Sequence, residues 1–407
     1  MPEAAQCESR EEKARSLAPA LIWLMAGGAG VGVATVYYIQ PVVPAVQAAF
    51  GLSSEQASLV PAVSQAGYAA GMALLAPLGD LIDRKRLILA KSGLLVLALL
   101  ATAVAPNLFL LLAASLAVGL LGSVGQDFIP VSAHLASPEN RGRTIGLVTT
   151  GLLSGILLSR TLGGAVGELF GWQAIYFIAA ILVALLGLAV WRLLPRQPAF
   201  VSGTYGSLLA SLTTLVVHQS VLRKALMTQA LLASTLGAFW STLALMLAAP
   251  PFGLGASAAG AFGLAGVAGA LGAPLFGGFA DRRGPMAAIR VGCLLVAAAF
   301  ALMAFEPQSM AALIVGAVLF DLGVMAGLVS HQTIVTSIDP AARSRLNGLL
   351  MTAAMIGMSL GAAAGGWAWS IAGWTGVCLT GVIAGLLALL RSLLPPTIST
   401  RSKEIAS

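Results

Sequence analysis

Three ionisable residues, Asp127, Arg160 and Asp321, lie well inside long apolar stretches of the chain. A charge near the centre of a membrane helix costs about 3 kcal/mol on insertion scales, so such residues persist where they face a partner or a water-filled cavity. A carboxyl group in that setting can bind a proton and release it when a cation approaches. We therefore predict that Asp127 or Asp321 binds a proton whose uptake and release are coupled to the function of the protein. The approach of Arg160 or of a substrate would release this proton. A purely structural ion pair is the alternative interpretation.

The depth of these residues in their stretches favours one partnership. At ~1.5 Å per residue, Arg160 lies roughly 24 Å from the start of its stretch, and Asp127 lies roughly 13 Å from the same membrane face. Asp321 falls near mid-depth, closer to the level of Arg160. We expect Asp321 rather than Asp127 to be coupled electrostatically to Arg160, and this expectation does not require direct contact.

A second group of candidates consists of aromatic and amide side chains within the apolar stretches. Aromatic rings beside a few polar groups suit a small amphipathic ligand. Tyr and Trp near helix ends also anchor proteins at the membrane surface, which is the alternative interpretation for each. The candidates for a substrate cavity are Tyr37, Tyr38, Gln40, Gln65, Tyr68 and Trp240.

The composition identifies the solvent around these residues. The chain has 407 residues, of which 9% are charged, and its mean hydropathy is +0.93. Soluble domains carry about 25% charged residues. We therefore predict an all-α integral membrane protein with the lipid bilayer as its surroundings. Its net charge of +7 does not then indicate nucleic-acid binding.

The sequence holds no residue cluster suited to a cofactor or to enzyme chemistry. The three Cys and three His lie too far apart for a disulfide framework or a metal site. No glycine motif for dinucleotide or phosphate binding occurs. We expect no cofactor, no metal and no enzymatic activity. A membrane-embedded enzyme or a non-transporting sensor is the remote alternative.

Twelve apolar stretches have about the 20 residues that a membrane helix needs, or more. We expect an N-terminal tail, a six-helix bundle, a linker, a second six-helix bundle and a C-terminal tail, at 1–18, 19–194, 195–222, 223–394 and 395–407. Helical spacing of apolar residues in the linker suggests a short interfacial helix, and a plain connection is the alternative. The stretches are 19–40, 56–78, 87–105, 108–135, 144–167, 173–194, 225–249, 256–279, 286–305, 310–336, 345–369 and 374–394.

The basic residues sort to one membrane face in this arrangement. Every Lys and Arg except Arg160 falls at a tail or loop on the same side, and this set includes Lys91 after the second stretch. The positive-inside rule assigns that side to the cytoplasm. We therefore predict that both termini are cytoplasmic.

The two halves of the chain repeat each other at an offset of roughly 200 residues. Because each half holds six stretches, the halves share one orientation and form a parallel repeat, which is typical of transporters that rock two bundles around a central site. The clearest echo is Gly-x-x-x-Asp-Arg after the second and the eighth stretch, at Gly79, Asp83 and Arg84 and at Gly277, Asp281 and Arg282.

The segment that runs from Gly79 through Asp83 and Arg84 to Arg86 resembles a signature of the major facilitator superfamily, Gly-x-x-x-Asp-Arg-x-Gly-Arg-Arg, without its inner Gly. The resemblance extends to the twelve stretches, the duplication and the central linker. It implies the fold of that superfamily, with helices 1, 4, 7 and 10 around a cavity. It also implies that both Gly-x-x-x-Asp-Arg sequences form a conformational latch; plain orienting charge is the alternative.

The fifth stretch resembles the glycine-rich fifth helix of drug:proton antiporters in that superfamily, Gly-x-x-x-Gly-Pro-x-x-Gly-Gly. Small residues four positions apart let membrane helices approach closely. Arg160 stands where those antiporters carry proline. The glycines that would form a groove on this helix are Gly151, Gly155, Gly163 and Gly164.

The sequence Asp321-Leu322-Gly323-Val324 is similar to bacterial exporters related to sugar and drug efflux permeases. The resemblance implies a transporter of the bacterial inner membrane that works by alternating access. It implies proton-coupled export of a small amphipathic, drug-like or sugar-like molecule, with no requirement for an oligomer. A uniporter or a proton-coupled uptake symporter on the same fold is the alternative.

Overall fold

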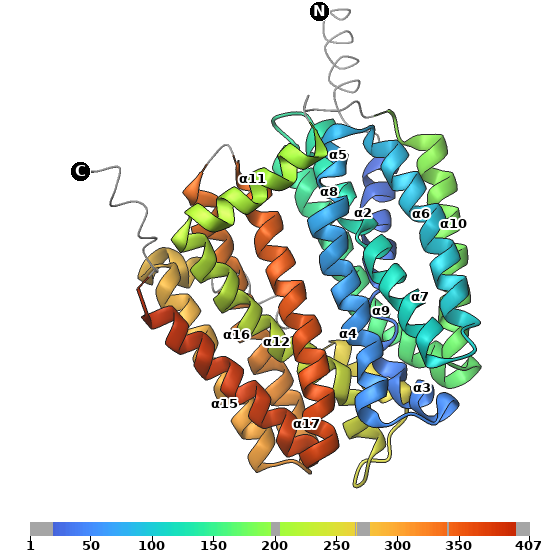
Figure 1. The fold of residues 1–407 in the computed structure, drawn as a ribbon, viewed down its shortest axis with the longest axis vertical. Helices are drawn as coiled ribbons and strands as arrows, with labels where there is room; N and C mark the ends of the chain where they lie inside the picture. The colour runs from blue at the N-terminus through green and yellow to red at the C-terminus, as the bar shows by residue number, and fades with distance from the viewer. Residues whose placement is uncertain (1–18, 197–203, 265, 267–276, 340–341, 396–407) are drawn as a thin grey trace, which may run out of the picture.

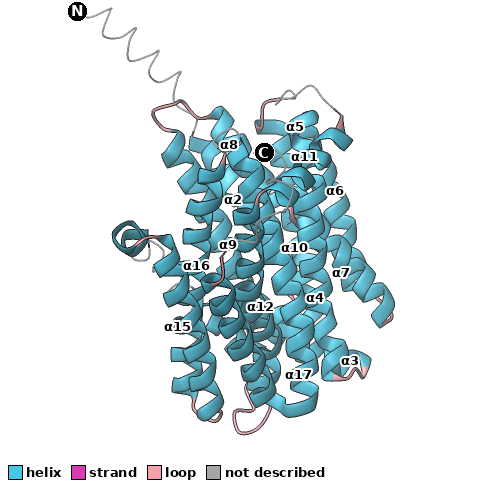
Figure 2. Cartoon of the chain, turned by 60° about the vertical axis from the view of Figure 1, so that its left-hand side comes forward, coloured by secondary structure: helices cyan, strands magenta, loops and turns pink. Residues whose placement is uncertain are grey.

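The computed structural model describes residues 19–196, 204–264, 266, 277–339 and 342–395. Within these ranges every regular element is helical (Figure 2). The predicted tail 1–18, nearly all of the tail 395–407 and the middle of the eighth stretch lie outside the described residues.

Among residues 19–196, the first half of the chain forms eleven helical elements. Side chains cap the start of two of these helices: Ser53 and Gln56 form a capping box, and the Asn107 side chain accepts a hydrogen bond from the Leu110 amide at 3.0 Å. The elements are α2 (Pro19–Ala34), η1 (Gln40–Val42), α3 (Val43–Phe50), α4 (Ser54–Ala70), η2 (Gly71–Leu75), α5 (Leu78–Leu81), α6 (Arg84–Ala103), α7 (Leu108–Gly122), α8 (Val124–Leu135), α9 (Arg141–Phe170) and α10 (Trp172–Leu193).

The linker and the second half add seven described elements. The predicted linker 195–222 contains a helix, α11, so it is more than a plain connection. The elements are α11 (Tyr205–His218), α12 (Ser220–Ala248), α13 (Ala256–Ala261), η3 (Phe262–Leu264), α15 (Pro285–Phe305), α16 (Met310–Ile338) and α17 (Arg343–Leu393).

Nine segments in the described ranges are long and apolar enough to cross a membrane. One of them, α17, covers the last two predicted stretches, and a kink at Ala372 and Gly373, where the backbone leaves the helical conformation, divides it into two helices. The first predicted stretch corresponds to α2, which has 16 residues. The described helices therefore agree with the predicted all-α membrane architecture.

The first stretch ends earlier than we expected. The prediction placed one span over 19–40, but α2 ends at Ala34 and the chain continues through turns into η1 and α3. Pro41 stands at the start of η1, where proline is tolerated but cannot extend a preceding helix. Tyr37 and Tyr38 therefore project from a turn.

Each half has its own apolar core. One buried cluster is built mainly from α2 to α10, and two others are built from α12 to α17. Figure 1 shows these two groups of helices side by side, with α11 lying across them at one end of the molecule. We call this the α11 end, and we call the opposite end, where α3 lies, the α3 end.

Two seams join the halves toward the α3 end. In the first, Thr161 Oγ1 on α9 donates to the Gly260 carbonyl at 3.1 Å, and the Ser257 amide donates to Glu168 Oε2 at 2.7 Å. In the second, the Ser359 hydroxyl on α17 donates to the carbonyl of residue 62 on α4 at 2.8 Å. The structure thus holds the two halves together around the depth of Arg160.

Glycines on α9 bring that helix against α2. A Cβ added to Gly151 would collide with the Ala26 backbone, and one added to Gly155 would collide with the Gly30 backbone. This close approach is what small residues at four-residue spacing allow. The other two predicted glycines, Gly163 and Gly164, also lie at tight helix contacts.

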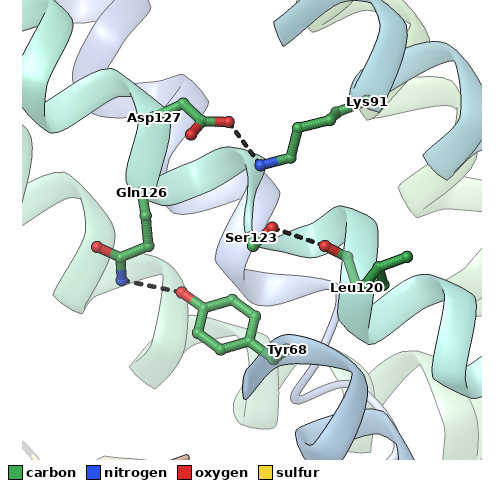
Figure 3. Close-up of polar contacts among 6 residues, drawn as sticks. All are labelled: Tyr68, Lys91, Leu120, Ser123, Gln126 and Asp127. Atoms are coloured by element: carbon green, nitrogen blue, oxygen red, sulfur yellow. Dashed lines mark hydrogen bonds and ion pairs between the residues drawn. The ribbon is translucent and has the colours of Figure 1, made fainter. Parts of the chain in front are cut away.

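Two helix irregularities meet inside the first half. The π-helix η2 begins at Gly71, where a Cβ would collide with the Leu120 carbonyl. Nearby, Ser123 separates α7 from α8, and its hydroxyl donates to the same carbonyl at 2.6 Å (Figure 3). Because α8 starts inside the predicted span, Asp127 lies in its first turn, where the helix dipole favours a carboxylate.

Candidate functional site

Arg160 lies at the junction of the two halves and is only 6% exposed. Its Nε donates to Gln40 Oε1 at 2.7 Å. Its guanidinium carbon lies 4.0 Å from the ring centroid of Trp240 and 5.1 Å from that of Tyr37, so two aromatic faces stabilise the cation. Three residues predicted separately from the sequence, on two segments of the chain, therefore surround a charge on a third segment.

Asp321 approaches the same arginine from the second half. It lies in α16, is 8% exposed, and accepts a hydrogen bond from the Trp240 indole. Arg160 and Asp321 interact electrostatically, but no ion pair within 4.0 Å joins these two described residues. The expected coupling of Arg160 to Asp321 stays a prediction, and it would act without an ion pair.

A small cavity borders this cluster. Its volume is about 10 Å³, and its walls include Gln40, Arg160 and Trp240. That volume is about the minimum for one water molecule. The Gln40 amide nitrogen is buried and has no hydrogen-bond partner among the described residues. A polar group entering the cavity would find a free donor beside the guanidinium.

Asp127 sits in a different environment. Its Oδ2 accepts a hydrogen bond from Lys91 Nζ at 2.6 Å, and the two side chains are only 4% and 3% exposed (Figure 3). The pairing corrects the assignment of Lys91 to the basic loop residues, because this lysine lies inside α6 and not at its end. Asp127 is thus neutralised within the first half.

Three other predicted cavity residues do not contact the guanidinium. The Tyr68 hydroxyl accepts a hydrogen bond from Gln126 Nε2 at 2.9 Å, one residue from Asp127 (Figure 3). Gln65 is fully buried, and neither polar atom of its amide has a partner in the described part of the chain. Tyr38 lines a separate groove between α2 and α9. Their substrate role stays a prediction.

The predicted latch residues lie where α5 meets α6. Arg84 forms its ion pair with Asp80, at 2.5 Å, one helical turn earlier. Asp83 caps α6 by accepting the Lys85 amide at 2.9 Å. In the second half, the matching residues Asp281 and Arg282 are exposed. A Cβ added to Gly79 would make only ordinary contacts, and one added to its match, Gly277, would meet nothing within 4 Å.

Sequence reasoning missed three polar contributors: Lys91, Asp80 and Gln126. The signal for Lys91 was present, because the third apolar stretch, 87–105, already contained it. A cation inside a predicted span requires a partner. Nothing in the sequence pointed to Asp80 or Gln126, because the role of each depends on a contact seen only in the structure. Asp80 pairs with Arg84 one turn away, and Gln126 donates to Tyr68 on another helix.

Comparison with known proteins gives the family. Residues 23–338 match the family model described as Major Facilitator Superfamily. The chain belongs to this superfamily. The transporter is 38% identical over 374 residues to the uncharacterised transporter YgaY of Escherichia coli O157:H7, which covers 92% of this chain and 95% of the relative. It is 32% identical over 349 residues to SCO4007 of Streptomyces coelicolor, also named as a transporter, with 86% and 81% covered.

A solved structure supports the fold of this transporter. A mutant of the nucleoside transporter NupG superposes with a TM-score of 0.77, covering 92% of this chain and 99% of NupG, at 15% sequence identity. At that identity the likeness shows the fold alone. Family and fold together identify a multi-pass membrane transporter of small molecules.

Proposed function

We propose that this protein is a secondary active transporter that exports a small amphipathic or sugar-like molecule in exchange for protons. Asp321 binds the proton, and Arg160 or the substrate displaces it. The observation that carries the proposal is the charge cluster shared between the halves: Arg160 comes from the first half, whereas Asp321 and Trp240 come from the second.

The division of this cluster matters because alternating access moves one half against the other. A rocking motion that changes the distance between α9 and α16 changes the field of Arg160 at the Asp321 carboxylate. Asp127 and Lys91, by contrast, lie in one half and move together. Only the first arrangement couples proton affinity to the conformational state.

We further propose that the α11 end faces the cytoplasm, as the positive-inside rule indicates. The two hydrogen-bonded seams then close the transporter on its outer side. We infer from these seams an inward-facing conformation, which suits loading of a cytoplasmic substrate before export. The proposed domains, 19–194 and 223–394, are the rocking units, and 195–222 links them.

The test begins with substrate identity. Growth of an expressing and a deleted strain across drugs, sugars and metabolites selects a substrate for flux measurements in inside-out vesicles. Export coupled to protons predicts uptake into these vesicles that collapses with the proton gradient. Flux that survives the collapse and runs only down the substrate gradient would instead identify a uniporter.

The same vesicles test the site. We expect Asp321→Asn and Arg160→Ala to lower proton-coupled flux about tenfold or more, equal to about 1.4 kcal/mol in the transition state. Glu306→Gln, which removes an exposed acid, is the matched control and keeps full flux. Wild-type coupled flux in Asp321→Asn and Arg160→Ala would refute the assignment.

A further inference from the structure

A second and much larger cavity lies on the other face of α9. It is a groove of about 760 Å³ between α2 and α9, within the range of about 300–1,000 Å³ that holds drug-sized ligands. Tyr38 and Ser159 line it, whereas their sequence neighbours Tyr37 and Arg160 form the charged site. A Cβ added to Gly27 would meet no atom within 4 Å, so the groove floor is open.

The sides of this groove are apolar and face outward. Trp23, Leu158 and Leu182 line it and are 72%, 53% and 40% exposed. Large exposed apolar side chains on a membrane helix meet hydrocarbon in the bilayer. An occupant of the groove must therefore be largely apolar and must reach it from the membrane.

A charged side chain lines one end of the groove, near the start of α9, whereas the polar groups farther along, such as Ser159 and Tyr38, carry only hydroxyls. Arg143 and Asn140 line this end together with the Ser137 and Thr144 hydroxyls. Arg143 is exposed, and it takes part in neither of the ion pairs found in the described ranges. Arginine is the side chain best suited to bind a phosphate, through paired N–H donors. The groove thus complements an amphiphile with an anionic head and an apolar tail.

The length of the groove fits a membrane lipid. Arg143 and Leu158 are 15 positions apart on α9, which is about 22 Å along the helix. Half of the bilayer hydrocarbon core is about 15 Å thick, so the wall spans the full depth of one leaflet. An acyl chain can lie along it while the head group stays at the membrane surface.

The inner wall of the groove is sealed. The close approach of Gly151 to Ala26 and of Gly155 to Gly30 leaves no room for a side chain between α2 and α9. A molecule in the groove therefore cannot pass through this seam toward Arg160. This geometry favours a retained lipid over a substrate in transit.

We propose that the groove between α2 and α9 binds one anionic glycerophospholipid from the leaflet at the α11 end. Its phosphate lies at Arg143, and one acyl chain lies over Gly27 and along Leu158. The bound lipid fills the space outside the close seam between α2 and α9. It stabilises this packing by binding the folded state.

The full-length protein, purified in detergent, tests this site by native mass spectrometry with added phosphatidylglycerol or phosphatidylcholine. The wild type should retain one phosphatidylglycerol in preference to phosphatidylcholine. Gly27→Leu fills the groove and should lower phosphatidylglycerol retention about tenfold or more. Arg143→Gln removes the basic group and should lower it about fivefold.

Two matched variants control for general effects. Gly93→Leu places the same side chain on an exposed face of α6, where a Cβ also meets nothing within 4 Å. Arg141→Gln removes an exposed charge two positions from Arg143, outside the groove lining. Both should retain the lipid as the wild type does.

Unfolding temperatures measured with and without phosphatidylglycerol show which variants fold. If Gly27→Leu does not fold, Arg143→Gln carries the test alone. Wild-type retention of phosphatidylglycerol by the folded groove variants would overturn the site. Equal retention of both lipids by the wild-type protein would overturn the anionic head group. Loss of lipid in Gly93→Leu or Arg141→Gln as large as in the groove variants would also overturn the proposal.

Discussion

The two buried acids of this transporter differ in where their cations come from. Asp127 is paired with Lys91 inside the first half, with 2.6 Å between the charged atoms (Figure 3). Asp321 belongs to the second half, and the cation that acts on it, Arg160, belongs to the first half without forming an ion pair. A charge pair within one rigid unit supports that unit, whereas a charge pair divided between two units can report their relative position.

The two acids should also differ in how much stability is lost when one of them or its cation is mutated. Breaking a fully buried ion pair leaves one uncompensated charge and is strongly destabilising. Removing Asp321 leaves Arg160 with its Gln40 hydrogen bond and two aromatic faces. We therefore expect changes at the first pair to affect stability and changes at the second to affect transport.

The largest effect is expected for Lys91→Met. This change leaves Asp127 buried without its cation and should lower the free energy of unfolding by about 3–5 kcal/mol. Denaturation of the purified protein in detergent measures the loss. The double variant Lys91→Met/Asp127→Leu replaces the pair by apolar side chains and should recover most of it. A single variant as stable as wild type would show that the pair does not hold the first half together.

Asp321→Asn tests the other acid. The amide keeps the size of the side chain and an oxygen that accepts the Trp240 indole hydrogen bond. We expect an unfolding free energy within about 1 kcal/mol of wild type, because no ion pair is broken. Proton-coupled flux should fall about tenfold or more. A large loss of stability with unchanged coupling would reverse the comparison between the two acids.

Arg160→Lys isolates the geometry of the cation from its charge. Lysine keeps the charge but loses the planar group that stacks on Trp240 and the Nε donor to Gln40. Cation–π stacking of this kind is worth about 0.5–2 kcal/mol, so we expect coupled flux to fall about two- to thirtyfold. Flux measured beside Arg160→Ala in the same vesicles separates charge from shape. Equal loss in both variants would mean that charge alone is insufficient.

Sequence reasoning favoured Asp321 as the acid coupled to Arg160, but it did not predict that Tyr37, Gln40 and Trp240 surround this arginine. Depth along the helices placed Arg160 and Asp321 at similar levels, because rise per residue is constant within a helix. The partner of Asp127 was missed because Lys91 lies seven positions after Arg84 and was grouped with the loop charges. The positive-inside rule counts basic residues by their position along the chain, so it does not distinguish a loop lysine from a buried lysine that an acid on another helix neutralises.

The fold was predictable where it depends on length and periodicity, and less so where it depends on local breaks. Helical stretches and the glycine contacts of Gly151 and Gly155 followed from spacing. The early end of α2 and the break at Ser123 did not, because the predicted stretches 19–40 and 108–135 run through both. These breaks nevertheless decide the site, since they turn Tyr37 toward Arg160 and start α8 just before Asp127.

The smallest expected effects come from a matched pair of aromatic changes, one beside each acid. Trp240→Phe removes the indole donor to Asp321 and keeps an aromatic face for Arg160, and Tyr68→Phe removes the hydroxyl that accepts from Gln126. A neutral hydrogen bond contributes about 1 kcal/mol, so Tyr68→Phe should lower stability by that amount and leave coupled flux unchanged. Trp240→Phe should lower coupled flux about fivefold, equal to about 1 kcal/mol. Equal flux losses in the two variants would contradict this contrast, because they would show that the surroundings of Asp127, including Tyr68, also serve transport.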